Sequence, residues 1–203
     1  MKRLLLSTVI SAFIFSSCGN DTKVKEVKKN EDGTTTTTSY DVDDAKKMAN
    51  TGNEIQKKME NLKKLAPLTM DQLKTLLPEE LSGMKRSDLK TTSAMGYAVA
   101  EAKYKKDEDE ELKAMVYDCA GTAGSTLYMG TYMGAMNFQQ ESEKEYTKTI
   151  NFKGGKAVEK YEKDRNRSTL TYVSNDRLLV VLEGKNMDPA ALKATAEDLN
   201  FSL

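Results

Sequence analysis

Alternation between residues 97 and 118 constrains the fold of this chain most. Small or apolar side chains occupy every second position of 97–104, and the same period of two recurs in 112–118. The recurring set consists of Ala98, Ala100, Ala102, Tyr104, Leu112, Ala114 and Val116. Because successive side chains of a strand point to opposite faces, this pattern predicts two strands with one buried face.

The run KKDEDEE at 105–111 lies between these two strands. It lacks the D-x-D-x-D-G ligand spacing of a calcium-binding loop. A mixed run of charges between two strands is typical of a solvated hairpin tip, and we expect one here.

Further strands are expected on both sides of an uncharged segment at 119–140. They are expected at 85–92, 146–152, 156–163, 168–174 and 178–182, with Gly154 and Gly155 as a two-residue turn and 178–182 as the central strand. Asp188 and Pro189 open a closing helix that runs to about residue 199. The predicted fold is α+β: a mainly antiparallel sheet of about six or seven strands with helices packed on one face, preceded by an N-terminal helix.

The uncharged segment is expected to form a buried helix over about 123–137. Gly124, Gly130 and Gly134 would let its backbone approach the sheet closely, which must offset about 1 kcal/mol per mid-helix glycine. Three thioethers, those of Met129, Met133 and Met136, share one helix face. Thioethers can bind Cu(I), but methionine at helical spacing more often fills a core, so no metal or other cofactor is expected.

Residues 41–66 carry apolar or small residues at alternating spacings of three and four, which predicts an amphipathic helix. It could pair as a coiled coil, but Gly52 and two alanines in its stripe favour a helix lying along its own domain. Pro67 ends it, and the α+β domain is expected to occupy 67–203. The polar stretch before it, 18–40, offers nothing to bury and is expected to be a disordered tether.

The composition limits the available chemistry. The chain has no histidine, which removes the usual catalytic base and the commonest metal ligand. Basic and acidic side chains are equal at 31 each, which argues against nucleic acid as a partner. Of the two cysteines, Cys119 is expected to be a buried and inert thiol.

A hydrolase would have to rely on paired carboxylates. The candidates are Glu141, Glu143, Glu145, Asp118 and Asp164. A chain with 31 acidic residues always offers such pairs, and charges on strands usually form a solvated face, so no enzymatic activity is expected.

The first eighteen residues have the pattern of a secretory signal. Lys2 and Arg3 precede an apolar run at 4–15, and small residues follow it. The run is too short for a membrane span, which needs about 20 residues. We therefore expect residues 1–17 to be a signal peptide.

Ser16 and Ser17 directly before Cys18 resemble the lipobox of bacterial lipoproteins, with Phe15 where leucine is commonest. The resemblance implies cleavage before Cys18, lipidation of its sulfur and acylation of the new amino terminus. Several acyl chains on one residue attach a protein stably to a membrane. The expected location is the bacterial cell envelope, on the outer membrane and facing the periplasm or the cell surface.

Four segments of the body, 68–86, 117–125, 150–161 and 176–184, resemble uncharacterised lipoproteins of the Bacteroidota. Residues 150–203 also resemble the PsbP/Mog1-like α-β-α domains, which mostly serve as binding or assembly modules. These resemblances imply an envelope location and no particular activity. The expected function is a non-enzymatic module that binds an envelope protein or a ligand. The alternatives are a carrier of a hydrophobic small molecule, with a cavity between the uncharged helix and the alanine face of 98–102, and a carboxylate-based hydrolase.

Overall fold

The computed structural model describes residues 12–15, 23–29 and 35–202, apart from 95, 107–108 and 135–137. Side chains are described from residue 52 onward, with 132–134 as a further exception. The chain divides into two compact units, Met1–Gln56 and Lys57–Leu203.

The first unit contains an antiparallel sheet of three strands in the order β1-β2-β3. The strands are β1 (Ala12–Phe15), β2 (Lys23–Lys29) and β3 (Thr35–Asp41). All of β2 and all of β3 except Asp41 lie in 18–40, where the sequence predicts a tether without regular structure. Threonine and valine favour extended strands, and β3 begins with four threonines in succession. Cys18 and most of the expected signal peptide lie outside the described residues.

Helix α1 (Val42–Lys64) begins in the first unit and ends in the second, close to the expected bounds of 41–66. Leu62 of its apolar stripe is buried, whereas Ala66, beyond the end of the helix, is exposed. A short helix, α2 (Met70–Thr75), follows. Thr69 caps it through a reciprocal pair of hydrogen bonds with Gln72, as the spacing of these two residues predicts.

In the described part of the second unit, nine strands form one sheet in which all neighbours are antiparallel. The order is β4-β5-β6-β7-β12-β11-β10-β9-β8. The bounds are β4 (Glu80–Leu81), β5 (Met84–Ala94), β6 (Tyr97–Lys105), β7 (Glu111–Asp118), β8 (Gln139–Glu141), β9 (Glu145–Phe152), β10 (Gly155–Glu162), β11 (Arg167–Ser174) and β12 (Leu178–Lys185). Three further elements are α3 (Gly121–Gly134), the 3₁₀ turn η1 (Lys163–Arg165) and α4 (Pro189–Asp198).

The predicted fold class is confirmed, but six or seven strands was too few. Strands β4 and β8, which have two and three residues, are too short to produce a periodic pattern in the sequence. Two meanders, β4 to β7 and β8 to β12, meet along the central pair β7 and β12. The apolar run at 178–182 is therefore the central strand that the sequence predicts, in register from Leu178 opposite Asp118 to Lys185 opposite Glu111.

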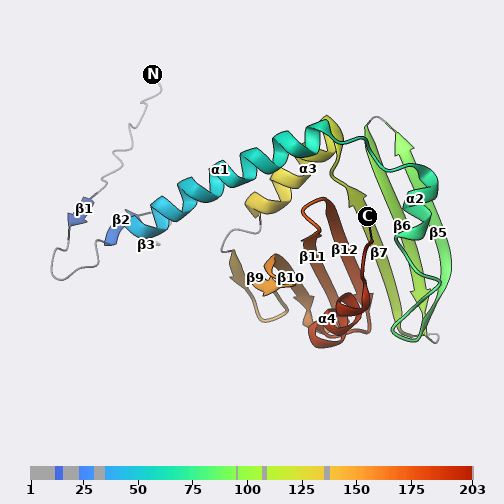
Figure 1. Ribbon diagram of the computed structural model, residues 1–203. Helices are drawn as coiled ribbons and strands as arrows, with labels where there is room; N and C mark the ends of the chain where they lie inside the picture. The colour runs from blue at the N-terminus through green and yellow to red at the C-terminus, as the bar shows by residue number, and fades with distance from the viewer. Residues whose placement is uncertain are drawn as a thin grey trace, which may run out of the picture. The chain divides into compact units, whose positions relative to one another are not determined.

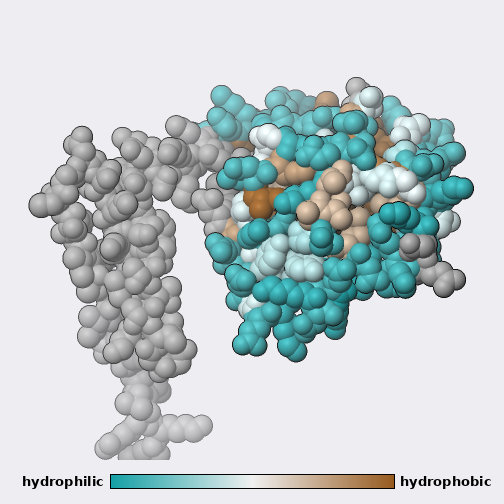
Figure 2. Space-filling model, turned by 90° about the horizontal axis from the view of Figure 1, so that it is seen from below, coloured by the Kyte–Doolittle hydropathy of each residue, from teal (hydrophilic) through white to brown (hydrophobic). Residues whose placement is uncertain are grey.

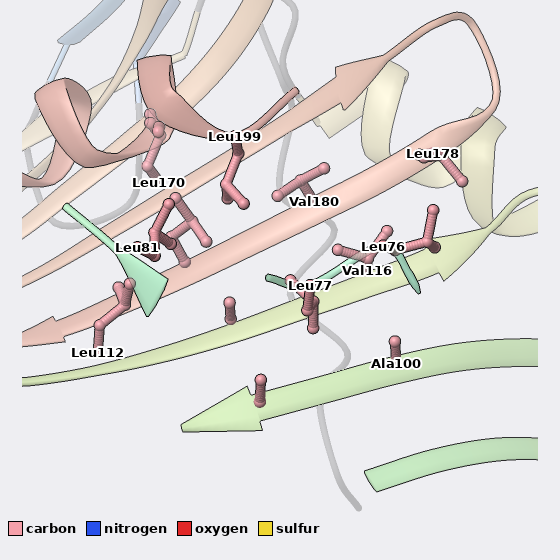
Figure 3. Packing of buried hydrophobic residues seen from close by; sticks show 14 of the residues in the cluster. Leu76, Leu77, Leu81, Ala100, Leu112, Val116, Leu170, Leu178, Val180 and Leu199 are labelled. Carbon is pink, nitrogen blue, oxygen red and sulfur yellow. The ribbon is translucent and has the colours of Figure 1, made fainter. Parts of the chain in front are cut away.

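Helices α2 and α4 lie on one face of this sheet (Figure 1), and the main core lies on that face. Ala100, Val116, Val180 and Tyr172 form one buried row across four neighbouring strands. Helices α2 and α4 cover this face, and Figure 3 shows Leu76, Leu77 and Leu199 from the helical side meeting the leucines and valines of the strands. The alanines of β6 thus pack beneath α2.

Helix α3 lies on the opposite face, so the expectation that helices pack on one face alone was wrong. Its Tyr128 and Thr131 face a hollow together with Thr171 and Val173, which alternate with the core residue Tyr172 along β11. Figure 3 shows α3 behind the sheet when the core is in front. The sequence pattern did not indicate this second buried face. Both faces of β12 and β7 are buried, and Leu179 and Met115 are the buried residues on the side of α3.

Gly124 allows the close approach of α3 that the sequence predicts. An added Cβ there would lie 2.5 Å from the carbonyl carbon of Cys119 and 2.8 Å from the carbonyl oxygen of Asp118. At Gly130 the same expectation is wrong, because a Cβ would meet no described atom within 4 Å. The surroundings of Gly134 lie outside the described side chains.

Candidate functional site

A hollow of about 330 Å³ opens between α3 and the sheet, and we call it the α3 pocket. It meets the lower size of common ligand sites, about 300 Å³. Its lining comes from α1, α3, β11 and two turns at one end of the sheet. The residues are Lys58, Tyr128, Thr131, Lys153, Gly154, Gly155, Lys156, Thr171, Val173, Asn175 and Asp176.

Two tight turns place the polar side of this pocket. Lys153 and Gly154 form the β9–β10 turn with φ of 46° and 77°, and Phe152 pairs with Gly155. The turn therefore lies one residue earlier than expected, with Lys153 in place of Gly155 as a central residue, and both central residues have the positive φ that a two-residue turn of this type needs. Asn175 and Asp176, each with φ of 52°, form the β11–β12 turn. Asparagine and aspartate tolerate this conformation, which explains their use here.

The charges of the α3 pocket are unequal, with three ammonium groups and one carboxylate in its lining. Lys58 pairs with Asp176 at 2.5 Å. Lys153 donates to the carbonyl oxygen of Leu199 at 2.6 Å, and burial lowers the pKa of Lys153. Lys156 donates to the Oδ1 of Asn151 at 2.9 Å and is exposed. The excess positive charge suits a ligand with a carboxylate or phosphate group.

The expected cavity for a hydrophobic cargo differs from this pocket in its walls. The alanine face of 98–102 packs beneath α2 on the other side of the sheet, so it does not line the α3 pocket. Four charged side chains do line it. Figure 2 shows the described residues from below, where most apolar residues gather near the middle of the face and hydrophilic residues lie around them.

The structure brings two of the five candidate carboxylates together. Glu145 and Asp164 line a hollow of about 530 Å³. Glu162 lines it too, and lysines pair with all three: Lys160 lies 3.1 Å from Glu145 and 3.2 Å from Glu162, and Lys144 lies 3.6 Å from Asp164. The hydrogen bond from Lys160 lowers the pKa of Glu162, whereas the general acid of a glycosidase needs a raised one.

The remaining candidate carboxylates lie elsewhere. Glu141 pairs with Lys163 at 3.3 Å, and Glu143 is exposed. Asp118 is buried at the end of β7, where Arg177 binds both of its carboxylate oxygens. Backbone N–H groups of Leu68 and Ala120 also donate to it, so its carboxylate is fully hydrogen-bonded and connects separate segments of the fold.

Sequence reasoning missed the buried carboxylate of Glu159. Its side chain is 3% exposed on the core side of β10. Tyr146 donates to its Oε1 at 2.9 Å, Lys148 lies 3.2 Å from that oxygen, and Lys193 of α4 lies 3.2 Å from Oε2. The Lys193 contact is an ion pair without the alignment of a hydrogen bond. The available signal was a charge at a core-facing position of an alternating strand.

These groups shift one another's pKa values. Burial works to raise the pKa of Glu159, but the contacts with Tyr146, Lys148 and Lys193 outweigh it and leave that pKa below its ordinary value. Burial, and then the neighbouring Glu159 carboxylate, raise the pKa of Tyr146. The cluster fastens α4 to the sheet through Lys193.

The described residues include the thiol that is expected to be inert and one methionine of the expected methionine face. Cys119 is fully buried, and burial raises its pKa to about 12. Met129 is 43% exposed, and the side chains of Met133 and Met136 lie outside the described residues. Within the described ranges, no three His, Cys, Asp or Glu side chains gather closely enough to hold a metal ion. None of the helices in this part of the chain combines the length and hydropathy that a membrane crossing requires.

The charged run at 105–111 joins β6 to β7 as the predicted hairpin tip. Lys105 pairs with Glu111 at 3.9 Å across the hairpin, and the N–H of Lys106 donates to the carbonyl of Glu110. Residues 107–108 are outside the described part.

No protein-family model, curated protein or solved structure matches this chain.

Proposed function

We propose that this chain is a bacterial lipoprotein of the cell envelope and that its α+β domain is a non-enzymatic binding module. The observation that carries the proposal is the apolar run at 4–15, which ends in Ser16, Ser17 and Cys18. Acyl chains on Cys18 would hold the domain at the membrane, on the outer membrane and facing the periplasm or the cell surface.

The α3 pocket is the place that we assign to the ligand. Its volume and its three lysines support a small molecule with a carboxylate or phosphate group. The charged lining weighs against a hydrophobic cargo. The lysine partners of Glu145, Glu162 and Asp164 weigh against the carboxylate-based hydrolase.

Metabolic labelling with an alkyne analogue of palmitate tests the anchor. The full chain should take up the label and fractionate with membranes, and Cys18→Ser should abolish both. Cys119→Ser is the matched control, because its buried thiol should not be acylated and the variant should still be labelled. Equal labelling of Cys18→Ser and the natural chain would overturn the anchor.

Thermal unfolding in the presence of inorganic phosphate or citrate tests the pocket. A ligand at ten times its Kd adds about 1.4 kcal/mol to the free energy of unfolding and therefore raises Tm. Lys156→Glu should remove this rise, whereas Lys90→Glu, an exposed lysine on β5, should keep it. If Lys156→Glu and Lys90→Glu respond alike, the α3 pocket is not the site.

A further inference from the structure

Strand β5 has an open outer edge. It has eleven residues, but its outer neighbour β4 has two and pairs only with Lys85 and Met84. The N–H of Arg86 donates to the carbonyl of Glu79, so the outer edge of β5 is also occupied at Arg86. Beyond it, residues 88–94 pair with β6 on one side and with no described strand on the other.

The hydrogen bonds at the two ends of β5 identify the same backbone groups as pointing away from β6. The hairpin with β6 has a two-residue loop, so its closing pair, Ala94 and Tyr97, exchanges hydrogen bonds. Alternation from that pair turns the N–H and C=O of Leu89, Thr91 and Ser93 away from β6. At the other end of β5, the N–H of Arg86 also points away from β6, toward Glu79. The bulge between Arg86 and Asp88 shifts the alternation by one residue, so this outward bond agrees with outward N–H and C=O groups at Leu89.

We propose that β5 pairs antiparallel with β5 of a second copy about a two-fold axis at Thr91. This register pairs all of 88–94, places Leu89 opposite the second copy's Ser93, and forms about six backbone hydrogen bonds. The two nine-stranded sheets then continue into one another.

Two neighbouring registers are excluded by the residues themselves. An axis at Leu89 would bring residues 92–94 of one copy against positions 84–86 of the other, which β4 and Glu79 already occupy. An axis at Lys90 would place the two Lys90 side chains directly opposite each other, and like charges in that position destabilise a pair of strands. With the axis at Thr91, Lys90 lies opposite Thr92.

The side chains of this edge also favour pairing. Leu89 is half-buried at the margin of the core, where a further strand would shield it. Residues 91–94 carry no charge and no proline, and these are the features that usually prevent an edge strand from pairing with another chain.

Disulfide trapping tests the register in cells that express the full chain. Opposed residues of a hydrogen-bonded pair have Cα atoms about 5.5 Å apart, within the range that a disulfide spans. Thr91→Cys should therefore give a covalent dimer on a non-reducing gel. Ser93→Cys alone should not, because its two copies would lie about 13 Å apart along the strands. A mixture of chains carrying Leu89→Cys and Ser93→Cys should cross-link again.

The natural chain is the control, because Cys119 is buried and Cys18 is present in every sample. Its mass in detergent, measured by analytical ultracentrifugation, should be that of a dimer, and Thr91→Lys, with two cations at the axis, should yield monomers. A natural chain that is monomeric at micromolar concentration, or equal cross-linking of Thr91→Cys and Ser93→Cys, would overturn the proposal. Neither result depends on the lipid anchor or on the α3 pocket.

Discussion

Arg177 binds Asp118 through two parallel contacts: its Nε lies 2.7 Å from Oδ1, and its Nη2 lies 2.8 Å from Oδ2. The same Nη2 donates to the carbonyl of Ala66, and the N–H of Leu68 donates to Asp118. This fork fastens the connection between α1 and α2 to the shared end of β7 and β12. The hydrogen bond with Asp118 also raises the pKa of Arg177.

Removing the charge of Asp118 should be costly. Its side chain is 0% exposed, so Asp118→Asn leaves Arg177 partly buried without its partner and should reduce the free energy of unfolding by about 3 kcal/mol. The control is Asp176→Asn, whose carboxylate is 69% exposed and pairs with Lys58. That change should cost less than about 0.5 kcal/mol. Urea unfolding followed by circular dichroism measures both, and similar losses would contradict the structural role of the fork.

Two glycines of α3 should respond to alanine in opposite directions. Gly124→Ala drives a Cβ into the backbone of Cys119 and Asp118, so we expect a loss of about 2 kcal/mol or more. Gly130→Ala meets open space and should gain up to about 1 kcal/mol from helix propensity. Thermal unfolding should give a lower Tm for the first variant and a higher one for the second. The same sign for both would mean that α3 does not approach the sheet at Gly124.

Two buried tyrosines differ in whether their hydroxyl has a partner. The hydroxyl of Tyr104 donates to the carbonyl of Pro78 at 2.8 Å, whereas that of Tyr172 has no hydrogen-bond partner among the described residues. Tyr104→Phe should therefore cost about 1 kcal/mol, and Tyr172→Phe should be neutral or gain about 1 kcal/mol. A larger loss for Tyr172→Phe than for Tyr104→Phe would show that the Tyr172 hydroxyl is bonded after all.

The lowered pKa of Glu159 links stability to pH. Because the pKa is lower in the folded chain than its ordinary value of 4.5, the stabilisation is complete above about pH 4.5 and is lost as the pH falls through the folded value. The natural chain should therefore lose more stability on acidification below pH 4.5 than Glu159→Gln does. At neutral pH, Glu159→Gln should cost about 1–3 kcal/mol, since both lysine partners remain about 40% exposed.

The measurement is urea unfolding of both chains from pH 3 to pH 7, and the difference between the two curves isolates Glu159 from the other carboxylates. Parallel curves would mean that Glu159 has the same pKa in the folded and the unfolded chain.

The local sequence pattern was sufficient to predict where the strands lie, but not which strands pair with each other. The alternation at 97–104 and 112–118 predicts β6 and β7 because one buried face imposes a period of two. Nothing in either segment indicates that β7 pairs with β12, some sixty residues later, since that choice depends on the whole sheet. The second layer was missed for a related reason: Leu179 and Met115 make their strands apolar on both faces, which hides the face that α3 covers.

The candidate site shows the same limit. Lys156, Thr171 and Tyr128 come from three separate elements, so no spacing in the sequence brings them together. The turn at Gly154 was visible from the sequence, but the proximity of its lysines to α3 was not. Glu159 was the exception, because a carboxylate at an inward position of β10 could have been identified by its phase alone.

The position of β12 sets an order in time. It is the last of the nine described strands of this sheet in chain order, yet it fills the middle of the sheet between β7 and β11. A nascent chain that stops before residue 178 therefore presents β7 with an open side where its permanent neighbour belongs. The sheet can close only after residues 178–185 have been made, and during that interval a long unpaired edge is exposed to other chains.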